Sequence, residues 1–185
     1  MDTAVLTLLK NLKNENSNIC IDSLKKLAEL KDKESAEEIS CLLCHNEAQV
    51  RSQCAHTLGQ IGSRKVLNKL MEVLEEEESS TVQSAILGAL ATIGGKGVSR
   101  KLREILVNPA SYLHKSLITA LSVWTKEDKG QRSPAREYEE ELFELSEMAE
   151  YPWKSMLVGI AQGLPSKKAE EYLLNVVINN HHCLN

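Results

Sequence analysis

The feature that most constrains this chain is an apolar pattern that returns at a nearly constant interval. Ile19, Val50, Val82, Leu113 and Trp153 occupy the same place in successive segments, at intervals of 31, 32, 31 and 40 residues. Two further sets follow eight and eleven positions later, namely Leu27, Leu58, Leu90, Leu121 and Ala161, then Leu30, Ile61, Ile93, Trp124 and Leu164. A period of this size is the signature of a solenoid, in which each unit buries its apolar face against its neighbours.

The segment Val50–Leu74 shows what one unit contains. Val50, Leu58 and Ile61 recur at helical spacing, so one stripe of the segment is apolar. Gly62 then follows, and a glycine at this place readily adopts the left-handed conformation that ends a helix. A second apolar stripe begins at Val66. The pattern therefore predicts a helix, a tight turn and a second helix.

Applied to the whole sequence, this pattern predicts an all-α protein of a single domain, 1–185. We expect an N-terminal helix at 3–13 and about five helical hairpins, at approximately 17–46, 47–78, 79–108, 109–150 and 151–180. Ser17 or Asn18 is expected to cap the first long helix. The second helix of the first hairpin should run through Cys41–Cys44. The polar stretch Thr125–Arg136, which contains a glycine and a proline, is expected to be a loop within the fourth unit.

The motif of Val50–Gly62, Val-Arg-x-x-Cys-Ala-x-x-Leu-Gly-x-Ile-Gly, followed by an amphipathic helix, resembles the short HEAT-like repeats named for bilin-lyase proteins. The resemblance is also good in Val82–Leu106 and looser in the flanking units. It implies a right-handed α-α superhelix whose second helices line the concave side. That family often places arginine directly after the anchor valine, and only Arg51 keeps it here. We therefore expect apolar packing, without a ladder of ion pairs, to hold the units together, and the acidic run Glu75–Glu78 to be a solvated turn.

The composition narrows the classes of function. A net charge of −4 and a pI near 5.8 give no general attraction to nucleic acid or to anionic lipid. No apolar run is long enough to span a membrane, and the N-terminus lacks the order of a signal peptide. Five cysteines, an odd number without a secretory signal, indicate reduced thiols in the cytoplasm.

Because the resemblance places second helices on the concave side, polar positions off their apolar stripes are the candidate binding residues. They are Lys65, Asn68, Lys69 and Glu72 in the second repeat, Arg100, Lys101 and Glu104 in the third repeat, and Glu140, Glu141 and Glu144 in the fourth repeat. A groove of mixed charge favours a non-catalytic scaffold or adaptor that selects a protein or peptide by complementary charge. The alternative interpretation is a solvated face of ordinary charge pairs.

Two other functions stay open. Nucleic-acid binding would rest on the basic residues near the centre of the array, which are Arg64, Lys65, Lys69, Arg100, Lys101 and Arg103. A bilin-lyase-like role follows from the resemblance alone, and the sequence offers no residues for a chromophore pocket. Both rank behind the scaffold interpretation. The acidic flanks and the pI disfavour nucleic acid, and the bilin-lyase-like role has no candidate residues.

Candidate chemical motifs predict no enzyme and no cofactor. The pattern Cys41-x-x-Cys44-His45 matches covalent haem attachment, and with a second cluster, His181-His182-Cys183, it also supplies ligands that zinc accepts. Each cluster offers only a partial ligand set, at opposite ends of the expected array. Cys54 and His56 lie two positions apart on one helix and therefore point in different directions. The glycines between 94 and 97 are most simply an inter-helix turn.

Overall fold

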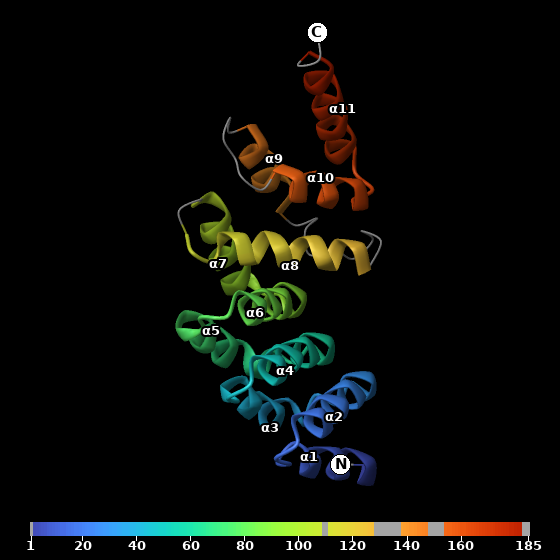
Figure 1. Ribbon diagram of the computed structural model, residues 1–185, viewed down its shortest axis with the longest axis vertical. Coiled ribbons are helices and arrows are strands. Elements are labelled where there is room, and N and C mark those ends of the chain that lie inside the picture. The colour runs from blue at the N-terminus through green and yellow to red at the C-terminus, as the bar shows by residue number, and fades with distance from the viewer. Residues whose placement is uncertain (1, 109–110, 128–137, 148–153, 183–185) are drawn as a thin grey trace. The chain divides into compact units, whose positions relative to one another are not determined.

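The computed structural model of this protein describes residues 2–108, 111–127, 138–147 and 154–182 (Figure 1). Every regular element in these ranges is a helix, which confirms the predicted all-α class. The chain divides into two compact units, 1–99 and 100–185, and each is described by itself. None of the helices in the described ranges is long and apolar enough to cross a membrane.

The first unit contains short and long helical elements in alternation. They are α1 (Thr3–Asn11), α2 (Ser17–Leu30), α3 (Ala36–Ser40), the 3-10 helix η1 (Cys41–Cys44), α4 (Ala48–Ile61), the 3-10 helix η2 (Arg64–Val66), α5 (Leu67–Glu76) and α6 (Ser80–Ile93). The next helix, α7 (Lys96–Val107), runs across the boundary between the units. The second unit continues with α8 (His114–Glu127), α9 (Glu139–Glu147), α10 (Lys154–Gly163) and α11 (Lys167–His182).

Within the first unit, the helices form two layers (Figure 1). The first helices α2, α4 and α6 lie side by side, with α4 packed against both of the others. The second elements form the other layer, in which α3 and η1 pack on α4 and α5 packs on α6. Each second element thus covers the first helix of the next repeat. In the second unit, α10 packs against α8, α9 and α11.

The repeating apolar positions form the core. The residues eight positions after each anchor, Leu27, Leu58, Leu90, Leu121 and Ala161, are all at most 1% exposed. The residues four positions after the anchors, Ser23, Cys54, Ile86, Leu117 and Leu157, are buried as well. This shared burial shows that the period read from the sequence reports equivalent places in successive helices.

The first repeat departs from this pattern. Ile19 and Leu30, which we expected in the core, are 38% and 49% exposed, whereas Cys20 is fully buried. The helix α2 is the first long helix of the stack, and it packs against α4 on one side and the shorter, nine-residue α1 on the other. Its apolar stripe is therefore covered less completely than that of α4. The anchors Trp124 and Trp153 lie outside the residues whose side chains are described.

The helix ends follow local backbone rules, with one correction. Gly62 ends α4 in the left-handed conformation, at φ 69°, and its N–H donates to the carbonyl of Leu58. The cap of α2 is Asn16, not Ser17 or Asn18, because Asn16 has the extended backbone that an N-cap requires. Its side chain accepts a hydrogen bond from the N–H of Asn18 at 3.0 Å.

Two expected boundaries also differ. The second element of the first repeat is not one continuous α-helix, because α3 ends at Ser40 and continues as the 3-10 helix η1. Leu43 nevertheless remains fully buried, so the tighter winding keeps the apolar stripe on the core. In the stretch Thr125–Arg136, which was expected to be a loop, residues 125–127 are the last turn of α8, and 128–136 lie outside the described residues.

Candidate functional site

The predicted binding residues of the second repeat form a patch on η2 and α5, which we call the α5 patch. It consists of Lys65, Asn68, Lys69 and Glu72, and all four side chains are exposed. The helix α5 turns Leu70 and Leu74 into the core, and its residues on the opposite side, among them Asn68, Lys69 and Glu72, face away from it. The sequence pattern therefore placed these four side chains on the surface correctly.

The charges of the α5 patch are only loosely paired. The ammonium group of Lys65 lies 3.5 Å from a carboxylate oxygen of Glu34, which precedes α3. The ammonium group of Lys69 lies 3.9 Å from Glu72, one turn along the same helix. All of these side chains are largely exposed, and such pairs add little to stability because water screens them. Both ammonium groups remain accessible to solvent.

The second unit carries a corresponding set of side chains on α7 and α9, which we call the α7/α9 patch. Arg100, Lys101 and Glu104 are exposed on α7, and Glu140 and Glu144 are exposed on α9. The side chain of Glu141 lies outside the described residues. That the two patches line one concave groove remains a prediction, since they belong to different units.

Aromatic and ionic contacts fix α9 in the second unit. The guanidinium of Arg103 on α7 lies 5.2 Å from the ring centre of Tyr138, a buried residue directly before α9. The rings of Phe143 and Tyr172 stack, with centroids 4.9 Å apart, and join α9 to α11. Lys168 of α11 donates a hydrogen bond to Glu140, which lowers the pKa of Glu140 and raises the pKa of Lys168. Part of the acidic charge on α9 is thus already matched by α11.

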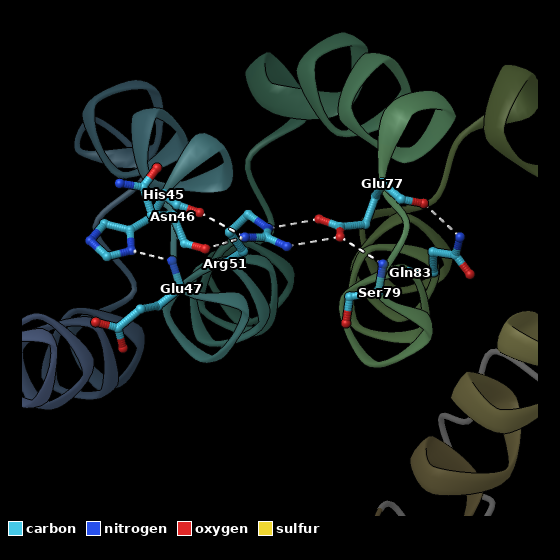
Figure 2. Close-up of polar contacts among 7 residues, drawn as sticks. All are labelled: His45, Asn46, Glu47, Arg51, Glu77, Ser79 and Gln83. Atoms are coloured by element: carbon cyan, nitrogen blue, oxygen red, sulfur yellow. Dashed lines mark hydrogen bonds and ion pairs between the residues drawn. The ribbon is translucent and has the colours of Figure 1, made fainter.

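A polar network that the sequence pattern did not predict joins consecutive repeats in the first unit. Figure 2 shows Arg51 of α4 facing Glu77, which follows α5, with Nε 2.8 Å from Oε2 and Nη2 2.9 Å from Oε1. Its Nη1 donates to the carbonyls of His45 and Asn46, at 2.8 and 2.9 Å. Glu77 is only 9% exposed. The expectation that Glu75–Glu78 is a solvated turn is therefore wrong for Glu77, because this bidentate pair ties the end of the 47–78 repeat to its first helix α4, whereas Glu75, Glu76 and Glu78 are exposed.

The same glutamate also organises the start of α6. Its Oε1 accepts a hydrogen bond from the N–H of Ser79 at 2.9 Å, and its carbonyl accepts one from Nε2 of Gln83 at 2.7 Å (Figure 2). The hydrogen bonds from Arg51 are the largest cause of the lowered pKa of Glu77, and burial opposes them. Glu77 therefore stays ionised while it links α4, the end of α5 and the beginning of α6.

One position in each of the first three repeats has the same hydrogen-bonding role, although its residue type changes. The residue directly after the anchor donates to the carbonyl six residues earlier: Cys20 Sγ to Asn14 at 3.2 Å, Arg51 Nη1 to His45 at 2.8 Å, and Gln83 Nε2 to Glu77 at 2.7 Å. The spacing was visible in the sequence, but the varied donors concealed the shared role. This shared contact indicates that α1 has the same position relative to α2 that a second helix has relative to the first helix of the next repeat.

The chemical motifs lie apart from these patches. Cys41 and Cys44 are exposed on η1, and Nδ1 of His45 accepts a hydrogen bond from the N–H of Glu47 at 3.1 Å. Within the described ranges, no group of three or more His, Cys, Asp or Glu side chains could hold a metal ion. The side chains of His181 and His182, and all of Cys183, lie outside them.

Cys54 is a core residue. Its thiol is fully buried and donates to the carbonyl of Ile39 at 3.1 Å. Burial, the largest cause, raises the pKa of this thiol well above its usual value. A thiol that stays protonated is a poor nucleophile, so the pattern of Cys54 with His56 supplies no catalytic pair.

Comparisons with known proteins give a sequence family and one related fold. Residues 5–91 and 39–122 match the family described as HEAT repeats. A crystal structure described as that of an engineered protein is 17% identical, with a TM-score of 0.50, and the match covers 95% of this chain and 85% of that chain. At this identity the likeness concerns the fold alone. None of the curated proteins matches the chain.

Proposed function

The chain belongs to the HEAT-repeat family, and we propose that it is a non-catalytic scaffold or adaptor that binds a protein or peptide through its second-helix patches. HEAT repeats generally serve as protein-interaction scaffolds, and their fold is typically non-enzymatic. Function in such folds depends on the surface side chains that the repeats present. The α5 patch and the α7/α9 patch are the surfaces that we assign to binding.

The observation that carries this proposal is the weak pairing of exposed charges on a well-packed support. Lys65 and Lys69 have carboxylate neighbours only at 3.5 and 3.9 Å, whereas Leu70 and Leu74 beneath them are at most 2% exposed. Loose surface pairs are exchanged at small cost for contacts with a partner, because water already screens them. The buried stripe keeps the backbone that carries these charges fixed, which reduces the entropy lost on binding.

The charges of the two patches indicate the chemistry of the partner. The α5 patch and the α7 half of the second patch carry lysine and arginine, whereas the α9 half carries Glu140 and Glu144. A matching segment would place acidic side chains opposite the former and basic side chains opposite the latter. Complementary charge of this kind raises the association rate and the specificity more than the affinity.

Charge reversal with a matched control tests the assignment. Lys69→Glu and Arg100→Glu each reverse one charge within a patch, and Lys25→Glu reverses an exposed charge on the first helix α2. The tagged proteins would capture partners from native lysate, with each partner quantified by mass spectrometry and each variant checked by circular dichroism. Like charges brought together at an interface cost several kcal/mol, so capture should fall by more than about tenfold for the patch variants and stay unchanged for Lys25→Glu. Equal capture by the wild type and both patch variants would remove the patches as the binding site.

Nucleic-acid binding is the alternative function. Among its proposed residues, Lys65 and Lys69 face carboxylates and Arg103 lies over a tyrosine ring. Titration of a labelled duplex at low and moderate salt distinguishes the two functions, because phosphate contacts give affinity that falls steeply with salt. The bilin-lyase-like role has no assigned residue, and mixing the protein with free bilin and recording absorbance tests it directly.

We place the protein in the cytoplasm. The thiols of Cys20, Cys41, Cys44 and Cys54 are free, and exposed free cysteines are usual where the compartment is reducing. Microscopy of the tagged full chain tests this location.

A further inference from the structure

The proposed binding function leaves the exposed cysteines of η1 unused. Cys41 and Cys44 are the first and last residues of this 3-10 helix, and both are exposed. A 3-10 helix has three residues per turn, so side chains three positions apart lie directly above one another. With a rise near 2 Å per residue, their Cα atoms are about 6 Å apart. That separation is within the range of roughly 4.4–6.8 Å that disulfides span.

The local structure holds the pair in this arrangement and leaves room for a small adjustment. Leu43, between the two cysteines, is fully buried and attaches the turn to the core. The backbone leaves the helix at His45, which is extended at φ −66° and ψ 145°. Eclipsed side chains start out parallel, so the two sulfur atoms must converge to form a bond. A bridge closed with some strain is more easily reduced than a relaxed one.

The surroundings favour thiol chemistry over metal binding. The Nδ1 atom of His45 is taken by the N–H of Glu47, and the described residues offer no third soft ligand beside the two thiols. Arg51 donates to the carbonyls of His45 and Asn46, the two residues after Cys44. The guanidinium of Arg51 is itself engaged by Glu77, which is the largest cause of its raised pKa.

The other described cysteines differ in burial. Cys20 and Cys54 are fully buried, whereas Cys41, whose thiol also donates to a backbone carbonyl, is exposed at that contact. They lie in the core of the stack, where a reagent in solution does not reach them. Reactivity in the described part of the chain should therefore be confined to η1.

We propose that Cys41 and Cys44 are an oxidation site that closes reversibly to an intrachain disulfide in the presence of a low-molecular-weight disulfide, for which oxidised glutathione is the representative. The thiolate of one cysteine attacks a sulfur of oxidised glutathione, forms a mixed disulfide and releases one glutathione thiolate. The second cysteine then attacks the protein sulfur of the mixed disulfide and releases the second glutathione. Two protein thiols are oxidised, one glutathione disulfide is reduced, and the two protons pass to the released thiolates.

Mass spectrometry of the full chain tests this proposal. Cys183→Ser serves as the common background, because that cysteine lies outside the described residues. After treatment with oxidised glutathione, the intact chain should lose the mass of two hydrogens, and a digest should show Cys41 joined to Cys44. Treatment with dithiothreitol should restore the original mass.

Single variants separate an intrachain bridge from simple thiol labelling. Cys41→Ser and Cys44→Ser, each checked for native helicity by circular dichroism, should instead retain the mass of one glutathione per chain. In the untreated protein, alkylation should modify Cys41 and Cys44 and leave Cys20 and Cys54 unmodified. The proposal is overturned if the background protein keeps one or two glutathiones without forming a bridge, if it forms disulfide-linked dimers, or if it does not react.

Discussion

Replacement of Glu77 by alanine tests whether the network between repeats contributes to stability. Glu77→Ala removes both carboxylate contacts to Arg51 and the acceptor of the Ser79 N–H. It leaves the guanidinium with its two carbonyl bonds to His45 and Asn46. The substitution therefore leaves the partly buried guanidinium of Arg51 without its counter-ion and exposes none of the apolar core.

The expected cost follows from the burial of the pair. Breaking a fully buried ion pair costs about 3–5 kcal/mol, and an exposed pair contributes about 0.2–1 kcal/mol. The side chains of Arg51 and Glu77 are 19% and 5% exposed, so this pair lies between those limits but nearer the buried one. Water still reaches the guanidinium, and its carbonyl bonds persist. We expect Glu77→Ala to lower the free energy of unfolding by about 2–3 kcal/mol, and Glu77→Gln, which keeps an acceptor, by about half of that.

Urea denaturation followed by far-ultraviolet circular dichroism measures this cost, with Glu78→Ala as the matched control. Glu78 is exposed in the same acidic run, so its removal should change the free energy by less than about 0.5 kcal/mol. Amide hydrogen exchange should also show faster exchange at the start of α6 in Glu77→Ala. If Glu77→Ala and Glu78→Ala have equal midpoints, the pair contributes nothing, and apolar packing alone holds these repeats together.

Two further predictions follow from burial and charge. Because the pKa of Glu77 is lowered in the folded state, its contribution is fully present above its unfolded value of about 4.3 and disappears as the pH falls through the lower folded value. The stability difference between the wild type and Glu77→Gln should therefore shrink below about pH 4 in urea titrations, and a difference that stays constant to pH 2 would contradict the lowered pKa. Leu58→Ala should cost about 2–5 kcal/mol, because Leu58 is fully buried, whereas Leu30→Ala should cost less than about 1 kcal/mol, because Leu30 is 49% exposed. Equal costs for the two substitutions would contradict the assignment of Leu58 to the core and of Leu30 to the surface.

The fold was predictable because packing in a repeat array repeats with the sequence. Leu58 and Leu90 occur at the same place in their units, and both are buried against neighbouring helices. Such positions report tertiary contacts through sequence spacing alone. The exposure of residues on α2, the first long helix, is not predicted in this way. The period assigned Ile19 to the core, yet the exposure of Ile19 depends on how far α1 extends over α2, which no periodicity encodes.

The surface of the candidate site was partly predictable, and its polar connections were not. The exposure of Lys69 and Glu72 follows from the buried stripe of α5, which the sequence displays. The role of Glu77 depends on the approach of Arg51 from α4, the first helix of the same repeat, 26 residues away. Four consecutive glutamates look alike in the sequence, and only the folded backbone brings one of them beneath the guanidinium. The arginine after Val50 was the one available signal, since an arginine beside a core position is normally paired with a carboxylate when it is buried.

The varied donors after the anchors have a consequence for the exchange of repeats. Cys20 and Gln83 complete a bond to the carbonyl behind them, whereas Arg51 also pairs with Glu77 at the end of its own repeat. The 47–78 repeat therefore carries both the cation and its counter-ion, and a chimera joined between Arg51 and Glu77 would leave a partly buried guanidinium without its carboxylate. A uniform repeat averaged from all units would lose this distinction. The modules share an architecture but are not interchangeable parts, because the residues that stand in place of Arg51, Cys20 and Gln83, cannot form this ion pair.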